Sequence, residues 1–213
     1  MNNLLIIIYF IPAYLVGSIS GGVIISKLVL NEDIRKHGSG NIGATNVART
    51  LGYGWGLLTV SIDIFKAVVP LLVLKYFILT GSLQDTYILC GAGFFILLGH
   101  IYPVFLKFRG GKGVAVFIGM MLVLLPLETL IFLVLYVIIA AITRYASLSS
   151  MISVAVFPVI IIFLNRANAY ILPYIILSVL LAIIIVIKHK ENIVRLKNGV
   201  EHKFSFKKKQ SGE

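Results

Sequence analysis

The chain has few charged residues for its length, and acidic residues are especially scarce. Only 13% of its 213 residues are charged, and 8 Asp and Glu stand against 19 Lys and Arg. A soluble domain of this size needs more polar side chains than this to cover its surface. With 59% hydrophobic residues and a mean hydropathy of +1.02, the chain is predicted to be an integral membrane protein.

Cysteine is nearly absent, and the histidines do not cluster. A single cysteine, Cys90, excludes an intrachain disulfide, and its apolar surroundings in the sequence indicate a small packing residue. The four histidines are far apart, and no HxxxH or CxxC pattern occurs, so neither a metal nor another cofactor is expected. A GxSxG elbow is also missing, which argues against a serine hydrolase.

Long apolar runs are abundant, and two of the five are too long for one membrane-spanning helix, which needs about 20 residues. Pro126 with Glu128 divides the fourth run, leaving a short segment Val114–Leu125, and the polar residues 165–168 divide the fifth. The sequence therefore predicts an all-α membrane domain over residues 1–213, with seven transmembrane helices and a flexible tail at 203–213. The five runs are Leu4–Leu30, Gly54–Leu79, Tyr87–Phe105, Val114–Thr143 and Met151–Ile187.

Basic residues are concentrated in particular connections between these runs. No basic residue precedes Lys27, so the positive-inside rule predicts an N-terminus outside the cell and, after seven spans, a cytoplasmic C-terminus. The outer connections would then hold little positive charge besides Arg166. Four polar connections are thereby predicted to meet on the cytoplasmic face: residues 39–49, 107–113, 144–150 and 189–201.

The first of these connections contains the sequence GSGNIGATNVAR, from Gly38 to Arg49. Glycine lets backbone N–H groups approach an anion, and a helix that begins near Thr45 would direct its N-terminal amides toward one. Arg49 could clamp a phosphate through two hydrogen bonds. The simpler alternative is a turn between helices with a polar cap, but glycine and polar residues are denser here than a short turn requires.

The second connection contains RGGKG, from Arg109 to Gly113. It resembles a phosphate-binding P-loop only loosely, because Val114 stands where that motif needs Ser or Thr. A basic cytoplasmic turn would explain Arg109 and Lys112. It would not explain the three glycines, which favours a role for the backbone in binding an anion.

Several isolated polar residues have two interpretations each. Asp63 and Lys66 share one helix face inside a predicted span, either as a structural ion pair or with Lys66 attracting an anionic substrate. His100 is either a packing residue or a site residue. His189 follows the last run, and a continuing helix would align it with Asn192 and Arg195, either in a site or as an interfacial anchor.

Together these motifs resemble the bacterial acyl-phosphate:glycerol-3-phosphate acyltransferase family. Three blocks stand in the family's order and span nearly the whole chain: GSGNIGATNVAR, GHIYPVFLKFRGGKGVA and HKENIVRLKNGVE, with SIDIFKAVVP and RYASLSS between them. The resemblance implies a seven-span enzyme of the bacterial cytoplasmic membrane with its active site on the cytoplasmic face. It would transfer a fatty acyl group from acyl phosphate to the 1-hydroxyl of glycerol 3-phosphate, giving lysophosphatidic acid and phosphate.

The resemblance also implies roles for the motif residues. Catalytic positions would be Lys112, Ser147, His189 and Asn192. The proton of the substrate hydroxyl would pass either to His189 or to an oxygen of the donor phosphate. Three further residues, Gly40, Lys66 and His100, are expected to bind substrate because of their residue types rather than the resemblance. The full set of expected substrate-binding residues is Ser39, Gly40, Asn41, Thr45, Asn46, Arg49, Lys66, His100, Gly110, Gly111, Gly113 and Glu201.

Other classes of protein explain these features less well. No histidine is followed five residues later by Asp, which disfavours the coenzyme-A-dependent acyltransferases that use that pair. A transporter for a phosphorylated solute would show inverted repeats and charges at mid-membrane. A noncatalytic scaffold would use the basic tail to bind anionic lipid, but it gives the glycine-rich loops no role. The expected partners are the two substrates and membrane lipids, with no nucleic acid and no obligate protein partner.

Overall fold

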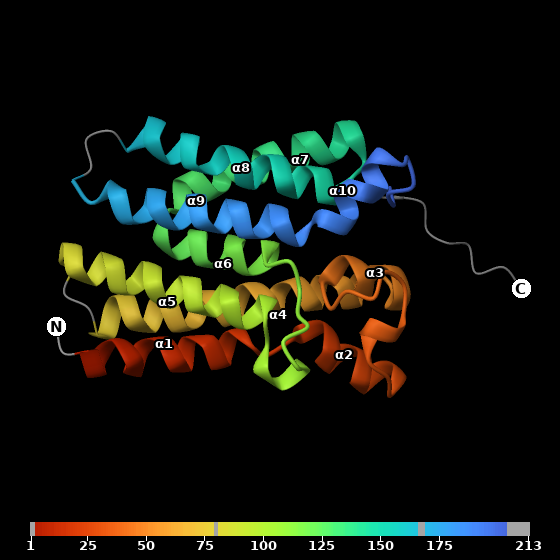
Figure 1. Cartoon of the computed structure of the whole chain (residues 1–213), viewed down its shortest axis with the longest axis horizontal. Helices are drawn as coiled ribbons and strands as arrows, with labels where there is room; N and C mark the ends of the chain where they lie inside the picture. The colour runs from red at the N-terminus through yellow and green to blue at the C-terminus, as the bar shows by residue number, and fades with distance from the viewer. Residues whose placement is uncertain (1–2, 79–80, 166–168, 204–213) are drawn as a thin grey trace, which may run out of the picture.

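The computed structural model describes residues 3–78, 81–165 and 169–203, and it confirms the predicted all-helical class (Figure 1). The longer helices lie roughly parallel along the long axis of the molecule. Their bounds are α1 (Asn3–Gly17), α2 (Gly21–Leu30), the 3₁₀ turn η1 (Ile34–Lys36), α3 (Ala44–Leu51), α4 (Tyr53–Val73), the π-helical turn η2 (Leu74–Ile78), α5 (Leu83–Ile101), the 3₁₀ turn η3 (Val104–Leu106), α6 (Val114–Leu124), α7 (Pro126–Thr143), α8 (Ala146–Leu164), α9 (Ile171–Lys188) and α10 (Lys190–Lys197).

The lengths and composition of these helices are those of a multi-pass membrane protein. Large apolar side chains such as Leu57 and Phe65 on α4 and Ile142 on α7 are exposed on the outside of the bundle, as lipid-facing side chains are. Within the described residues, six segments are long and apolar enough to cross a membrane: Ile8–Leu30, Tyr53–Phe77, Leu83–Leu106, Pro126–Thr143, Ala146–Leu164 and Ile171–Lys188.

The first apolar run differs from its prediction, because Leu4–Leu30 is interrupted. Helix α1 ends at Gly17 and α2 begins at Gly21. Between them Ser20 caps α2, its side chain accepting a hydrogen bond from the backbone N–H of Val23 at 3.3 Å. Glycine and serine favour such a break, and it leaves backbone groups available to side chains of neighbouring helices.

Helix α6 confirms the predicted short segment. It has 11 residues, which is about 17 Å of helix against a hydrocarbon thickness of about 30 Å. Pro126 occupies the first turn of α7 and separates the two helices as predicted. Helices α3 and α10 form one end of the bundle, and the short helix α6 starts well inside that end (Figure 1).

Two helix boundaries were predicted too late in the sequence. Helix α5 begins at Leu83 rather than Tyr87, because Ser82 and Asp85 form a capping box. Helix α8 begins at Ala146 rather than near residue 151, so Ser147 lies in its first turn and not in a connection.

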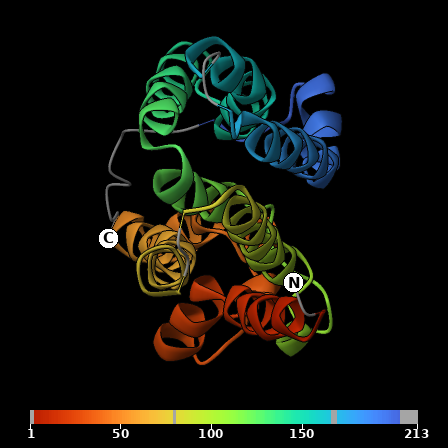
Figure 2. The same cartoon turned by 90° about the vertical axis from the view of Figure 1, so that its left-hand side faces the viewer.

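Helices pair through close contacts of small and aromatic residues. Gly119 of α6 lies against the backbone of α4, where a Cβ atom would come within 2.4 Å of the Ile64 carbonyl oxygen. Phe117, Phe132 and Phe157 join α6, α7 and α8, with ring centroids 5.1 to 5.9 Å apart. Seen along the helices, α6 lies between one group made of α1 to α5 and another made of α7 to α10 (Figure 2).

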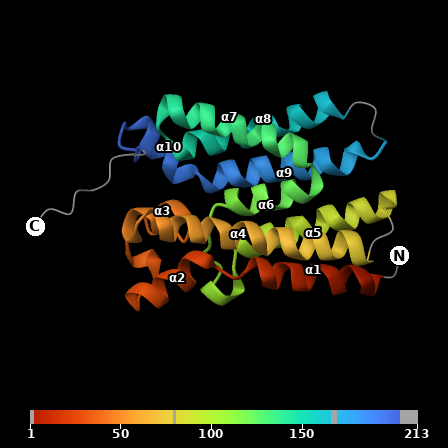
Figure 3. The same ribbon diagram turned by 180° about the vertical axis from the view of Figure 1, so that it is seen from behind.

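The polar connections gather at one end of the bundle. The segment between α2 and α3 and helix α10 lie there, the start of α6 faces this end from further inside the bundle, and the start of α1 lies at the opposite end (Figure 3). The predicted turn at 166–168 and, apart from Lys203, the predicted flexible tail fall on residues outside the described ranges.

Candidate active site

The loop before α3 is shaped by two glycines and one asparagine. Gly38 and Gly40 have φ angles of +57° and +70°, which glycine adopts without the strain of a side chain. The Asn46 side chain, only 2% exposed, accepts the Ser39 N–H at 2.8 Å and donates to the carbonyl of Asn41 at 2.8 Å. Asn46 therefore holds the loop in shape from inside.

Helix α3 begins at Ala44, which confirms the predicted helix start near Thr45. Thr45 and Arg49 are exposed on this helix and line the cavity described below. The N–H of Gly43 is held by the Asn41 side chain at 2.9 Å. Gly43, Ala44 and Thr45 at the start of α3 therefore line the same space as Arg49.

The glycine loop, residues 110–113, is folded tightly onto the end of α5. The Gly111 N–H donates to the His100 carbonyl at 3.0 Å. A Cβ atom on Gly110 would lie 2.1 Å from that carbonyl oxygen, so only glycine fits. Gly113 has a φ of +91° and is the N-cap residue directly before α6. Between these glycines, the Lys112 ammonium donates to the side-chain oxygen of Asn192 on α10.

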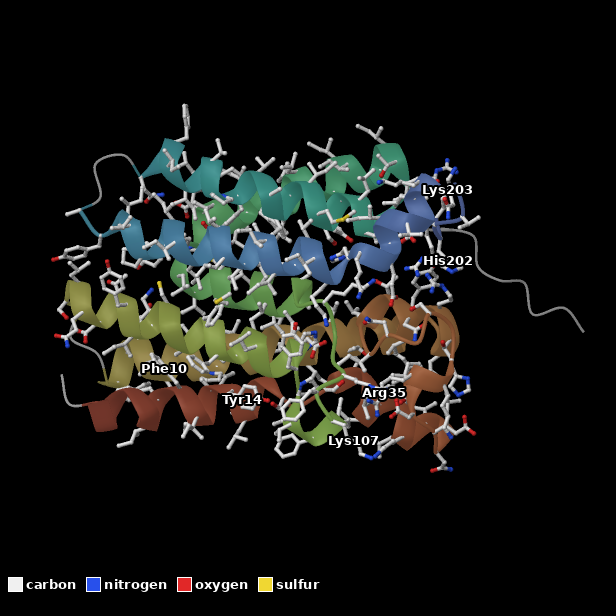
Figure 4. All side chains as sticks on the ribbon, in the orientation of Figure 1. Phe10, Tyr14, Arg35, Lys107, His202 and Lys203 are labelled. Carbon is white, nitrogen blue, oxygen red and sulfur yellow. The ribbon has the colours of Figure 1, made fainter. Side chains whose placement is uncertain are left out.

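The segment between α5 and the glycine loop is anchored at both ends (Figure 4). The Tyr14 hydroxyl of α1 donates to the Tyr102 carbonyl at 2.6 Å. Arg35 of η1 donates to the Leu106 carbonyl at 3.2 Å. The loops before α3 and before α6 are therefore tied to one framework.

Glu201 joins three elements after α10. One carboxylate oxygen accepts the Ser147 hydroxyl at 2.7 Å and the Asn192 amide at 2.6 Å. The other accepts Arg195 Nε at 2.7 Å. Burial acts to raise the pKa of Glu201, but the hydrogen bonds from these three partners outweigh it and lower the pKa. Glu201 therefore stays ionised and fixes the Asn192 amide that faces Lys112.

His189 lies at the joint between α9 and α10 and is 3% exposed. Its Nδ1 atom is 2.8 Å from the Ile185 carbonyl oxygen, so Nδ1 carries the proton and Nε2 is left as an acceptor. Burial, with a contribution from the Lys112 charge, lowers the pKa of His189 to about 4. The imidazole is neutral near pH 7.

These side chains surround a cavity of about 460 Å³, a size typical of small-molecule sites. One part is cationic, where burial and the charges of Arg195 and Arg49 lower the pKa of Lys112 to about 8. The other part is apolar, formed by Val60, Ile64, Ile118, Leu122 and Leu133. Predicted site residues that line the cavity are Ser39, Asn41, Thr45, Asn46, Arg49, His100, Lys112, Gly113, Ser147, His189, Asn192 and Glu201.

Four predicted residues do not line this cavity: Gly40, Lys66, Gly110 and Gly111. Gly110 and Gly111 face His100 instead. The Lys66 ammonium is occupied by protein groups, including Asp63, whose carboxylate lies 2.8 Å away. The ion pair, one of the two alternatives for Lys66, is therefore present, and a role for Lys66 in attracting substrate stays a prediction.

Sequence reasoning missed several lining residues. Asp63 and Arg195 were visible as partners of predicted residues, since spacings of three place them on the same helix faces as Lys66 and Asn192. Gly43, Ala44 and Ser150 lie within quoted motifs but were not singled out, whereas Tyr136 and His202 lie in no motif. Across the described residues, His, Cys, Asp and Glu form no group of three that could hold a metal ion.

Fold and cavity together define a multi-pass helical membrane protein with a cavity lined by Arg49, Lys112 and Arg195. Comparison with known proteins makes this class specific. A family model described as glycerol-3-phosphate acyltransferase matches residues 7–199. The chain belongs to the glycerol-3-phosphate acyltransferase family, as the sequence motifs predicted.

Relatives named glycerol-3-phosphate acyltransferase match nearly end to end. The protein of Bartonella henselae is 42% identical over 194 residues, covering 91% of this chain and 89% of its own. That of Finegoldia magna is 42% identical over 207 residues, covering 95% and 98%.

Solved structures agree with this. A crystal structure of PlsY (YgiH), an integral membrane glycerol 3-phosphate acyltransferase, in its glycerol 3-phosphate form is 36% identical with a TM-score of 0.82, covering 94% of this chain and 96% of that one. Its lysophosphatidic acid form is 35% identical with a TM-score of 0.79, covering 94% and 95%.

Proposed function

We propose that this chain transfers a fatty acyl group from acyl phosphate to the 1-hydroxyl of glycerol 3-phosphate, releasing lysophosphatidic acid and phosphate. One observation carries the proposal: Arg49, Lys112 and Arg195 meet in a cavity whose other wall is apolar. That cavity matches a reaction between a phosphorylated polyol and a phosphorylated lipid chain. The related PlsY structures are described in glycerol 3-phosphate and lysophosphatidic acid forms, which supports the same substrate and product here.

In the proposed topology, α6 is counted as a seventh crossing completed by its flanking loops. The N-terminus lies outside, and the cavity opens on the cytoplasmic face of the bacterial cytoplasmic membrane. The support is the positive charge of Lys27, Arg35, Lys36 and Arg144, which follows the positive-inside rule in the connections near the cavity.

The proposed catalysis is mainly positioning and electrostatics. Two phosphates must be brought together for the reaction, and their repulsion is offset by Arg49, Lys112 and the amides around α3 and the glycine loop. Asn192 orients Lys112, Glu201 orients Asn192, and Ser147 holds Glu201. The acyl chain lies along the apolar wall of the cavity.

In the proposed reaction the 1-hydroxyl oxygen attacks the acyl carbonyl carbon, and the bond from that carbon to the phosphate oxygen breaks. The phosphate leaves with the electron pair and takes the hydroxyl proton. A phosphate accepts a proton with a pKa near 6, whereas the pKa of His189 is about 4. This difference favours the phosphate as the final acceptor, with His189 Nε2 orienting the hydroxyl.

The test uses purified protein in lipid nanodiscs with a fatty acyl phosphate and glycerol 3-phosphate. Phosphate release and lysophosphatidic acid formation that require both compounds would support the enzyme. Movement of glycerol 3-phosphate into sealed vesicles without any product would instead show a transporter.

Orientation is tested with an impermeant maleimide on cells carrying single cysteines in a Cys90→Ala background. Lys36→Cys and Lys197→Cys, both at exposed positions, should react only after the membrane is opened. Gln84→Cys, near the start of α5, should react in intact cells. Labelling of position 36 and position 197 from opposite sides would contradict a shared face.

A further inference from the structure

Lys66 is a buried cation held by two hydrogen bonds and one ion pair. Its Nζ atom lies 2.7 Å from the Ile19 carbonyl oxygen and 2.9 Å from His100 Nδ1, and the Asp63 carboxylate lies 2.8 Å away. The side chain is 5% exposed. Lys66 does not line the cavity, which separates it from the cations there.

The contact with Lys66 also determines the form of His100. Because the ammonium donates to Nδ1, that nitrogen is an acceptor, and the ring proton is on Nε2. His100 is therefore a neutral ring of fixed tautomer and orientation. Because Nε2 carries the ring proton, His100 cannot use Nε2 to accept a proton from a substrate.

The glycine loop is packed on this fixed ring. The Gly111 N–H donates to the His100 carbonyl at 3.0 Å, and a Cβ atom on Gly111 would lie 2.2 Å from His100 Nε2. Backbone and side chain of His100 thus both touch the loop. Lys112, the next residue, extends from that loop into the cavity.

The hydrogen bond from Lys66 to Ile19 leads to the loop before α3. Ile19 belongs to the break between α1 and α2. Helix α2 in turn supports the loop before α3, since a Cβ atom on Gly22 would lie 2.0 Å from the Ile42 carbonyl oxygen. One ammonium group therefore contacts the supports of both loops.

We propose that Asp63, Lys66 and His100 form a positioning unit that sets the glycine loop, and with it Lys112, relative to the loop that carries Arg49. Asp63 balances the buried charge, Lys66 joins the two supports, and His100 transmits the position to Gly111. The expected effect on the KM for glycerol 3-phosphate rests on the proposed function. The expected structural effect, a glycine loop held in one position, does not.

The kinetic test compares His100→Leu with His100→Gln in nanodiscs. Glutamine keeps an acceptor for Lys66 and a donor toward the loop, whereas leucine keeps neither. We expect His100→Leu to raise the KM for glycerol 3-phosphate at least tenfold and His100→Gln to stay within threefold of the wild type. A merely structural role would lower the melting temperature without this KM difference.

The charge pair is tested by the double variant Asp63→Leu with Lys66→Met. Removing both partners avoids leaving an uncompensated buried charge, which would risk unfolding. The double variant should show the same KM increase as His100→Leu. Its matched control is Thr129→Val at the opposite end of the bundle, which removes a fully buried hydrogen bond to the Leu125 carbonyl.

An activity-independent readout is hydrogen–deuterium exchange of the glycine loop without substrate. Exchange of the Gly111 amide should be faster in His100→Leu and in the double variant, and unchanged in Thr129→Val. If the wild type transfers no acyl group, the proposed function is wrong. The exchange measurement would still test the positioning unit.

Three outcomes would overturn the positioning unit. The first is wild-type exchange and KM in both His100→Leu and the double variant. The second is equal impairment by His100→Gln and His100→Leu, which would show that the ring itself contacts substrate. The third is a similar KM increase in Thr129→Val, which would show a general effect of reduced stability.

Discussion

Replacing Lys112 by methionine removes one positive charge from the cavity and keeps an unbranched side chain of similar length. A single contact between opposite charges at about 4 Å is worth about 4 kcal/mol at an effective dielectric constant of about 20. Arg49 and Arg195 line the same cavity and retain part of this attraction. Burial of the ammonium, which lowers the pKa of Lys112 to about 8, offsets another part.

We therefore expect a net loss of about 2–3 kcal/mol of transition-state stabilisation, which is about a 30- to 150-fold decrease in kcat/KM. The assay is the initial rate of phosphate release against glycerol 3-phosphate concentration at pH 7. The matched control is Lys107→Met, an exposed lysine in the same connection that does not line the cavity, which should stay within twofold of wild type. A Lys112→Met enzyme within threefold of wild type would refute the reasoning, as would equal losses in both variants.

Other predictions concern pH, the imidazole and the carboxylate after α10. Because only the protonated form of Lys112 attracts phosphate and its pKa is about 8, kcat/KM should fall as pH rises through about 8; a profile flat to pH 10 would contradict this. His189→Leu should lose at least 100-fold in kcat while His189→Gln, which keeps an acceptor, stays within tenfold; normal turnover by the leucine variant would remove the imidazole from the reaction. Glu201→Gln loses its charge pair with Arg195 and should unfold about 2 kcal/mol more easily in thermal melts, unlike Glu191→Gln at an exposed position of α10.

Much of the fold could be predicted because apolar length and proline are direct signals of membrane helices. Pro126 separates α6 from α7 as predicted. The break at residues 18–20 could not be predicted, since glycine and serine also occur inside continuous membrane helices. The early start of α5 follows from a capping box at Ser82 and Asp85, a local signal that hydropathy conceals.

The motifs predicted which loops line the cavity, but not what each side chain contacts there. Asn46 and Lys66 are polar residues in or near motifs, and both use their hydrogen-bonding groups on the protein itself. A sequence shows spacing along the chain and not which donors are already satisfied. Tyr136 reaches the cavity from α7, where it stands in no recognisable pattern.

The joining of a cationic region and an apolar wall in one 460 Å³ cavity has a practical consequence for handling the protein. Single-tailed soaps and long-chain sulfates present the same combination of a negative head and a hydrocarbon tail. Such surfactants should compete with both substrates for the cavity. Purification in uncharged, sugar-headed detergents should therefore leave the cavity free to bind the substrates.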